Sequence, residues 1–171
     1  MYKEGNSKAC ASTTLAAISH FSIAEGRSDI THNPVIKKIV KVAFTLAFGG
    51  AFRISQLVPP SKKAIGKGVM AKHVLIQEGK VLVYINRSKT DQAGKGRRIG
   101  MEATGETTCP VSSLEKYMSV IPEGGQLLLL HKDPFPLSAF QFRQVLKRAI
   151  IDNGWDQKRF GSHSFRIPLY S

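Results

Sequence analysis

The spacing of apolar residues changes along this chain, and that change most restricts the folds open to it. Between about residues 72 and 101 the apolar residues form short β-type runs at 73–76, 81–85 and 97–101. The sequences Glu78-Gly79-Lys80 and Gly94-Lys95-Gly96 separate these runs as turns. Elsewhere the apolar residues recur at helical spacing. The pattern predicts an α+β fold, mainly α, with a small three-stranded antiparallel sheet packed on helices.

Helix boundaries are marked by capping and breaking residues. Asn33-Pro34 predicts the start of a helix whose apolar positions continue to Ala47, and Gly49-Gly50 breaks it. A short helix is expected at 52–57, stopped by Pro59-Pro60. Further helices are expected at 12–23, at 111–120 after Cys109-Pro110, and at 139–153.

The end of the sequence contains two further signals. Ser138 is placed to cap the helix at 139–153, and Trp155 is expected to close over the apolar face of that helix. Ser162 predicts the cap of a last short helix carrying His163 and Arg166, which Pro168 would end.

Charge is the strongest compositional signal. The 171 residues include 25 Lys and Arg against 12 Asp and Glu, a formal charge of +13, and are 42% hydrophobic. That size supports one domain with a core, and the charge favours a polyanionic partner, foremost nucleic acid. A basic protein without such a partner is the alternative, because net charge does not determine fold.

Several other classes of protein find no support in the residues. Cys10 and Cys109 lack metal-ligand spacing and fit free thiols, and the histidines lack zinc spacing, so neither metal nor cofactor is expected. The apolar stretch 39–52 carries Lys41 and is too short to span a bilayer. Charged residues interrupt the start where a secretory signal would lie. We expect an intracellular protein, with a nuclear location, and no membrane partner.

Four side chains suit the chemistry of a phosphodiester. Arg53 follows the broken helix, Lys89 follows the second β-type run, and His163 and Arg166 stand three residues apart near the end. Arginine holds phosphate oxygens through two parallel hydrogen bonds, and His or Lys supplies a mobile proton. Each also has a structural reading as a cap, an ion-pair partner or a solvated charge. Phosphate-binding P-loop and Gly-x-Ser-x-Gly patterns do not occur.

The segments around these residues resemble the tyrosine recombinases, the phage-integrase family, and look closest to those of eukaryotic DIRS and Crypton mobile elements. The stretch 47–57 is similar to the family's first box, 88–92 to its β-hairpin lysine segment, and 163–167 to its second box. The resemblance implies that Arg53 and Arg166 clamp the scissile phosphate. It also implies that Lys89 is the general acid for the leaving 5′ oxygen and that His163 assists proton transfer. Lys95 is a weaker candidate for the role of Lys89.

The sequence departs from the family pattern in two places. The family's nucleophilic Tyr lies roughly thirty residues beyond the second Arg, whereas Tyr170 is four residues beyond Arg166 and is not assigned that role. A family member would also have several tens of residues joining its core-binding helices to the catalytic domain, whereas Lys38 here runs almost directly into Ala43. The resemblance therefore implies a remnant of a helical, SAM-like core-binding domain at 1–42 and a catalytic domain at 43–171, truncated at its C-terminus. Both departures are expected of a decayed mobile-element copy, a splice variant or a mis-assembled gene sequence.

The resemblance implies a site-specific recombinase or integrase that cleaves and rejoins DNA through a phosphotyrosine. This chain is expected to bind double-stranded DNA without cleaving it, with a homo-oligomer on DNA as a further expected assembly. Basic residues expected to contact DNA lie in the first helix, the following loop and the third run: Lys37, Lys38, Lys62, Lys63, Lys95, Arg97 and Arg98.

Two alternatives remain beside this function. One is a non-enzymatic DNA-binding protein derived from a mobile element, and the other is an RNA- or ribosome-associated protein. Truncation is also expected to leave apolar surface exposed around Phe142, Leu146 and Ile150, and so to yield a poorly soluble chain.

Overall fold

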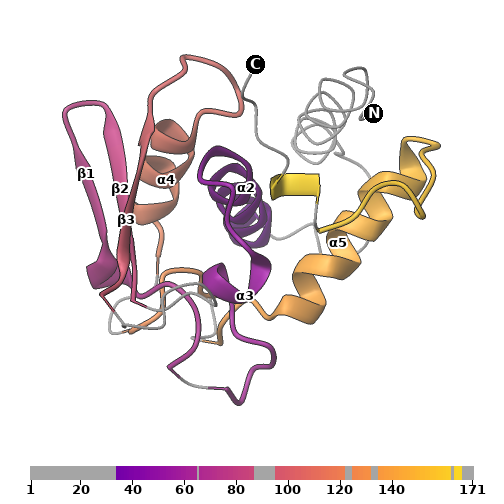
Figure 1. The fold of residues 1–171 in the computed structure, drawn as a ribbon, viewed down its shortest axis with the longest axis horizontal. Coiled ribbons are helices and arrows are strands. Elements are labelled where there is room, and N and C mark those ends of the chain that lie inside the picture. The colour runs from indigo at the N-terminus through magenta and orange to yellow at the C-terminus, as the bar shows by residue number, and fades with distance from the viewer. Residues whose placement is uncertain are drawn as a thin grey trace.

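The structure is a computed structural model that describes residues 34–64, 66–86, 95–121, 125–131, 135–162 and 164–166. The helix expected at 12–23 lies outside these residues. The described elements form successive layers, with the sheet on one side, then α4 (Pro110–Met118), then α2 (Pro34–Gly49), and α5 (Ala139–Asp152) on the far side (Figure 1). The expected α+β fold with one small antiparallel sheet is confirmed.

Helix α2 is the centre of the molecule. From Ile39 to Ala47 every residue except Lys41 is at most 2% exposed. A helix that is apolar on all its faces is stable only when it is covered on all sides. Thr45 is the polar exception among the fully buried positions, and its hydroxyl donates to the Val42 carbonyl at 3.1 Å. The predicted helix is therefore confirmed as the core around which the other elements pack.

The sheet has the order β1-β2-β3, with β1 at Val74–Gln77, β2 at Lys80–Ile85 and β3 at Arg97–Glu102. Both pairs are antiparallel, with Val74 opposite Val83 and Val83 opposite Ile99. Alternation along β2 buries Val81, Val83 and Ile85 against the helices. A 3₁₀ turn, η2 (Ala71–His73), leads into β1. The strands begin and end within a few residues of the predicted runs.

Tyr117 joins α4 to the buried segment 127–130. Its hydroxyl donates to the carbonyls of Leu128 and Leu130, at 2.9 and 3.0 Å, and accepts the Leu130 N–H at 2.8 Å. The segment is also paired to the loop before the sheet, because Leu128 N–H donates to the Val69 carbonyl at 2.8 Å. Four consecutive leucines are thereby held beside α4, with isolated β-bridges at Leu127 and Leu130.

Helix α5 begins as predicted at the Ser138 cap. The Ser138 hydroxyl accepts the Gln141 N–H at 3.3 Å, and Gln141 Oε1 accepts the Ser138 N–H at 3.0 Å. This reciprocal pair is a capping box, which satisfies two of the N–H groups that a helix start leaves without partners. Ser138 is 4% exposed, so these bonds replace contacts with water.

The apolar face of α5 is covered, contrary to the sequence-based expectation. Phe142, Leu146 and Ile150 are 1%, 7% and 4% exposed. The Phe142 ring packs against Phe44 of α2 with centroids 4.6 Å apart, and half-buried Trp155 packs against the same core. The prediction of an exposed apolar patch here was wrong, because α2 and the turn after α5 cover this face.

No helix of the described residues is long and apolar enough to cross a membrane. The same part of the chain contains no group of three or more His, Cys, Asp or Glu side chains placed to hold a metal ion.

Replacing Tyr117 by Phe is expected to lower the free energy of unfolding by about 1–3 kcal/mol, because Leu130 N–H and two carbonyls lose a buried partner. Urea unfolding measures the change. Tyr84→Phe is the matched control, since that hydroxyl makes one exposed bond, to the Lys95 carbonyl at 3.3 Å, and its loss is expected to cost less than about 0.5 kcal/mol. Equal losses in the two variants would contradict the assigned role of Tyr117.

The same substitution has an expected pH signature. Burial raises the pKa of Tyr117 to about 12, although the Leu130 hydrogen bond acts in the opposite direction. An unfolded tyrosine ionises near pH 10, so the contribution of Tyr117 is complete below about pH 10 and is lost as the pH rises toward 12. The stability difference between wild type and Tyr117→Phe should therefore shrink over that interval. A constant difference would show that the hydroxyl is not desolvated.

Candidate nucleic-acid interface

Arg53 is placed by the way α2 ends. Phe52 N–H donates to the Ala47 carbonyl at 3.0 Å and Ala51 N–H to the Phe48 carbonyl at 3.2 Å. Ala51 has φ of 48°, in the left-handed region. These two bonds around a left-handed residue form a Schellman motif, which reverses the chain after a helix. The motif directs Phe52 into the core, where it is 1% exposed, and delivers Arg53 just beyond it.

A glycine is required next to this reversal. A Cβ on Gly50 would overlap the Phe52 ring, so position 50 has no room for a side chain. The two glycines that the sequence analysis treated as a helix break therefore have separate roles. Gly49 is the last residue of α2, and Gly50 allows the Phe52 ring to pack back on the helix end.

Arg53 precedes the short helix α3 (Ile54–Leu57) and is half-buried. Its N–H donates to Gln56 Oε1 at 2.7 Å, and its carbonyl accepts the Gln56 N–H at 2.9 Å. Ile54 and Leu57 are buried beneath it. The helix starts two residues later than predicted because Phe52 and Arg53 are needed for the turn. The backbone of Arg53 is thus fixed on both sides.

Arg166 belongs to η3 (Ser164–Arg166), a 3₁₀ turn packed against α2. Phe165 holds this turn in place: it is 2% exposed, and its ring lies 5.6 Å from Phe44 and 5.8 Å from Phe142 between centroids. Figure 1 shows η3 between α2 and α5. The sequence order alone does not show that the segments of Arg53 and Arg166 adjoin the same helix.

The predicted last helix begins later than expected. Ser164 N–H donates to the Gly161 carbonyl at 2.9 Å, and Gly161 N–H donates to the Ser164 hydroxyl at 3.2 Å. The local hydrogen bonds therefore centre on Ser164, and the assignment of Ser162 as a helix cap was wrong. His163 lies outside the described residues, as does Lys89, so their proton-transfer roles stay predictions.

Eight basic side chains of the described residues gather at one end of the sheet. This end, named here the basic end, comprises the start of α3, the loop 58–70, η2 and the start of β3. Seven of its cationic side chains are exposed and Arg53 is half-buried. Its members are Arg53, Lys62, Lys63, Lys67, Lys72, Lys95, Arg97 and Arg98. Among the described residues no carboxylate belongs to this end.

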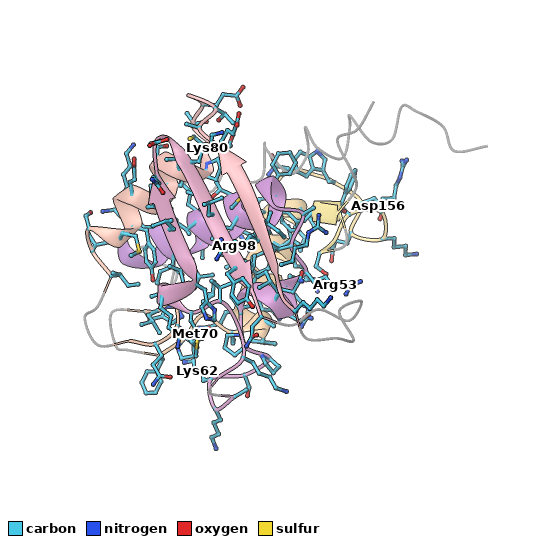
Figure 2. The ribbon with its side chains drawn as sticks, turned by 60° about the vertical axis from the view of Figure 1, so that its left-hand side comes forward. Arg53, Lys62, Met70, Lys80, Arg98 and Asp156 are labelled. Carbon is cyan, nitrogen blue, oxygen red and sulfur yellow. The ribbon has the colours of Figure 1, made fainter. Side chains whose placement is uncertain are left out.

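The opposite end of the sheet has the reverse balance. The β1–β2 turn carries Glu78, and β3 ends at Glu102 with Glu106 beyond it. Lys80 pairs with Glu102 at 2.9 Å, and this pair lowers the pKa of that carboxyl. Figure 2 shows Lys80 at one end of the sheet and Lys62 and Met70 toward the other, with Arg53 at the lower right. The two ends of the sheet therefore differ in the sign of their charge.

Of the other predicted DNA contacts, Lys38 is half-buried in α2, and Lys37 lies in the same helix. Lys67 and Lys72 were not among the predicted DNA contacts, although they also belong to the basic end. A signal for them was present, because residues 34–77 contain eight Lys and Arg and no Asp or Glu. An acid-free stretch of that length is a stronger indication of a polyanion surface than any single lysine pair.

Two other titratable groups have perturbed pKa values away from the basic end. Burial raises the pKa of the Cys109 thiol, but hydrogen bonds from backbone N–H groups, foremost that of Ser112, outweigh this and lower it to about 7. Burial, with the neighbouring Lys116 ammonium, lowers the pKa of Lys41 in α2. Neither Cys109 nor Lys41 adjoins Arg53 along the chain.

The described part of the basic end offers cations for an anion and no assigned nucleophile.

Comparison with known proteins identifies this fold. No protein-family model matches the sequence, and no curated protein sequence does. Among solved structures, the chain is similar to the XerH site-specific recombinase bound to difH substrate in a pre-cleavage complex, with a TM-score of 0.61 and 14% identity over 90% of this chain and 38% of that one. The XerH post-cleavage complex with palindromic difH gives a TM-score of 0.60 at 14% identity, covering 90% of this chain and 37% of that chain.

A lambda integrase (75–356) dimer bound to a COC′ core site is similar with a TM-score of 0.55 and 17% identity, over 91% of this chain and 48% of that one. The chain therefore spans less than half the length of these structures. At such identities the likeness establishes the fold, which is that of the tyrosine-recombinase catalytic domain.

The turn that places Arg53 generates a paired prediction. Gly50→Ala is expected to lower the free energy of unfolding by about 1–3 kcal/mol, since the new methyl overlaps the Phe52 ring. Ala51→Gly is expected to raise it by about 1 kcal/mol by relieving a left-handed alanine. Denaturant unfolding measures both. If the two substitutions shift the midpoint in the same direction, the Schellman geometry is not the one formed in solution.

Proposed function

We propose that this chain is a DNA-binding domain of a site-specific recombinase, and that duplex DNA lies on the basic end. The observation that carries the proposal is the separation of charge along the sheet. Eight cationic side chains and no described carboxylate occupy the end that bears Arg53, whereas the opposite end carries Glu78, Glu102 and Glu106. Such a surface attracts the phosphate backbone independently of base sequence.

The likeness of fold supports the choice of DNA as the polyanion. XerH and lambda integrase, as described above, are bound to DNA sites in their structures. The proposal extends to membership of the tyrosine-recombinase family, with the DIRS and Crypton elements as the nearest group. The division of the chain at residue 42, the nuclear location and assembly into a homo-oligomer on DNA belong to the same proposal.

Within this family reading, Arg53 and Arg166 would hold one phosphate, and Lys89 and His163 would move protons. Support for the pair Arg53 and Arg166 comes from α2. The Schellman motif at the C-terminus of α2 positions Arg53. Phe44 of the same helix anchors the turn that contains Arg166. Arginine suits this role because it stays charged and donates in a planar fork. No residue of this 171-residue sequence is assigned the nucleophile, so we propose that this chain by itself binds DNA without cutting it.

Binding is tested with two double variants of equal charge. Lys62→Gln/Lys63→Gln alters the basic end, and Lys158→Gln/Arg159→Gln alters the exposed turn after α5, near Asp156 in Figure 2. Each lowers the formal charge from +13 to +11. Fluorescence anisotropy with a labelled duplex, titrated over a range of salt, gives the affinity and its salt slope.

The expected result is a selective effect of the first variant. Loss of two phosphate contacts should reduce the slope of log K against log salt by about 2, and the control should leave the slope unchanged. Equal losses in the two variants would mean that net charge alone drives binding. A wild-type affinity that does not vary with salt would contradict DNA binding at the basic end.

Cleavage is tested with a nicked suicide substrate, which traps a covalent protein–DNA link if one forms. We expect no adduct from this chain on denaturing gels. The alternative function is that of a non-enzymatic DNA-binding protein, which is also expected to give no adduct. The test therefore separates these two functions from that of an active recombinase. An adduct that disappears in Tyr170→Phe would instead identify Tyr170 as a nucleophile.

A further inference from the structure

An aromatic side chain stands exposed beside the basic end. Phe135 is 55% exposed, although the residues that follow it, Pro136 and Leu137, are buried. The Phe135 carbonyl accepts the His131 N–H at 2.8 Å, and Pro136 bridges to Leu130. The ring is therefore presented from a backbone that the core holds in place.

Lys62 of the loop 58–70 lies over this ring, with its ammonium 5.7 Å from the ring centroid. The loop and the Phe135 segment are joined through the core as well, because Ala139 N–H donates to the Pro59 carbonyl at 2.8 Å and Leu128 N–H to the Val69 carbonyl at 2.8 Å. A cation placed over an aromatic face is attracted by the ring quadrupole. The pair thus combines an apolar ring and a positive charge on two segments that backbone hydrogen bonds join.

A nucleotide matches this combination. The base of a nucleotide offers a flat face that stacks on an aromatic ring, and the phosphate of the nucleotide pairs with an ammonium. An apolar protein partner would have to approach across eight cationic side chains, which disfavours any partner that is not acidic. We propose that Phe135, together with Lys62, forms a stacking site for an unpaired base of DNA held on the basic end. This inference rests on the proposed DNA-binding function.

The base must be unpaired for a geometric reason. In an intact duplex both faces of each base are covered by its neighbours, and only the edges are accessible in the grooves. A protein ring reaches a base face only where a nucleotide has left the stack, as at a bulge or an opened step. The site therefore discriminates between opened and fully paired DNA of the same length and charge.

The test compares two duplexes that differ in one feature. One is fully paired, and the other contains a single bulged 2-aminopurine, whose fluorescence reports stacking. The wild type is expected to bind the bulged duplex more tightly by between about fivefold and a hundredfold and to change the fluorescence of the probe. Phe135→Ala is expected to remove that preference and to leave the affinity for the paired duplex within about twofold.

Three further variants separate aromatic stacking from simple burial. Phe135→Leu keeps an apolar side chain without a π face and should also lose the preference, whereas Phe135→Trp should keep it. Phe140→Ala is the matched control, because Phe140 is 64% exposed on α5 and should leave the preference intact. Thermal unfolding of each variant checks that the fold is unchanged.

The outcomes distinguish the two proposals. If the wild type binds neither duplex, the proposed DNA-binding function is wrong. If it binds both equally, or if Phe135→Ala or Phe135→Leu retains the preference, the stacking site is wrong while DNA binding stands. Loss of the preference in Phe140→Ala with retention in Phe135→Ala would also overturn the assignment.

Discussion

Burial of the α2 segment 42–47 on all sides is the constraint on which the rest of the structure depends. A helix segment with no exposed face gains nothing from water, so the neighbouring elements are required to cover it. Helix α4 covers one side, and α5 with η3 covers the other (Figure 1). Phe44 makes the contact with α5 and η3, since its ring packs against both Phe142 and Phe165. Aromatic pairs of this kind add about 0.5–1.5 kcal/mol each beyond their buried area.

The position of the candidate site follows from that burial. Because Leu46 and Ala47 near the end of α2 are fully buried, the left-handed turn at Ala51 places Arg53 at a defined point on the surface. The same helix anchors Phe165, and with it the backbone of the turn that holds Arg166. The backbones of two arginines more than a hundred residues apart are thus positioned from one scaffold. A fixed backbone at Arg53 suits anion binding, since little ordering of the main chain remains when the anion arrives.

The charge separation has a topological cause. In an antiparallel meander the β1–β2 turn and the end of β3 share one end of the sheet, and the starts of β1 and β3 share the other. Glu78 and Glu102 therefore meet at one end, while Lys72 and Arg97 meet at the other. The lysine-rich loop 58–70 joins the second group because Val69 bonds to Leu128 beneath the sheet. A shift of register or strand order would mix the two signs.

Much of this protein was determined by the sequence itself. The change from helical to alternating spacing predicted the sheet, Ser138 predicted the start of α5, and the lack of carboxylates in 34–77 indicates a polyanion surface. These are local properties, set by backbone preferences and by charge. Tertiary structure alone decided three other features: that η3 packs as a 3₁₀ turn against α2 through Phe165, that Phe142 and Leu146 are covered, and that Lys62 meets Phe135. Each of these depends on contacts between segments far apart in the chain, and local sequence preferences do not encode which distant surfaces pack together.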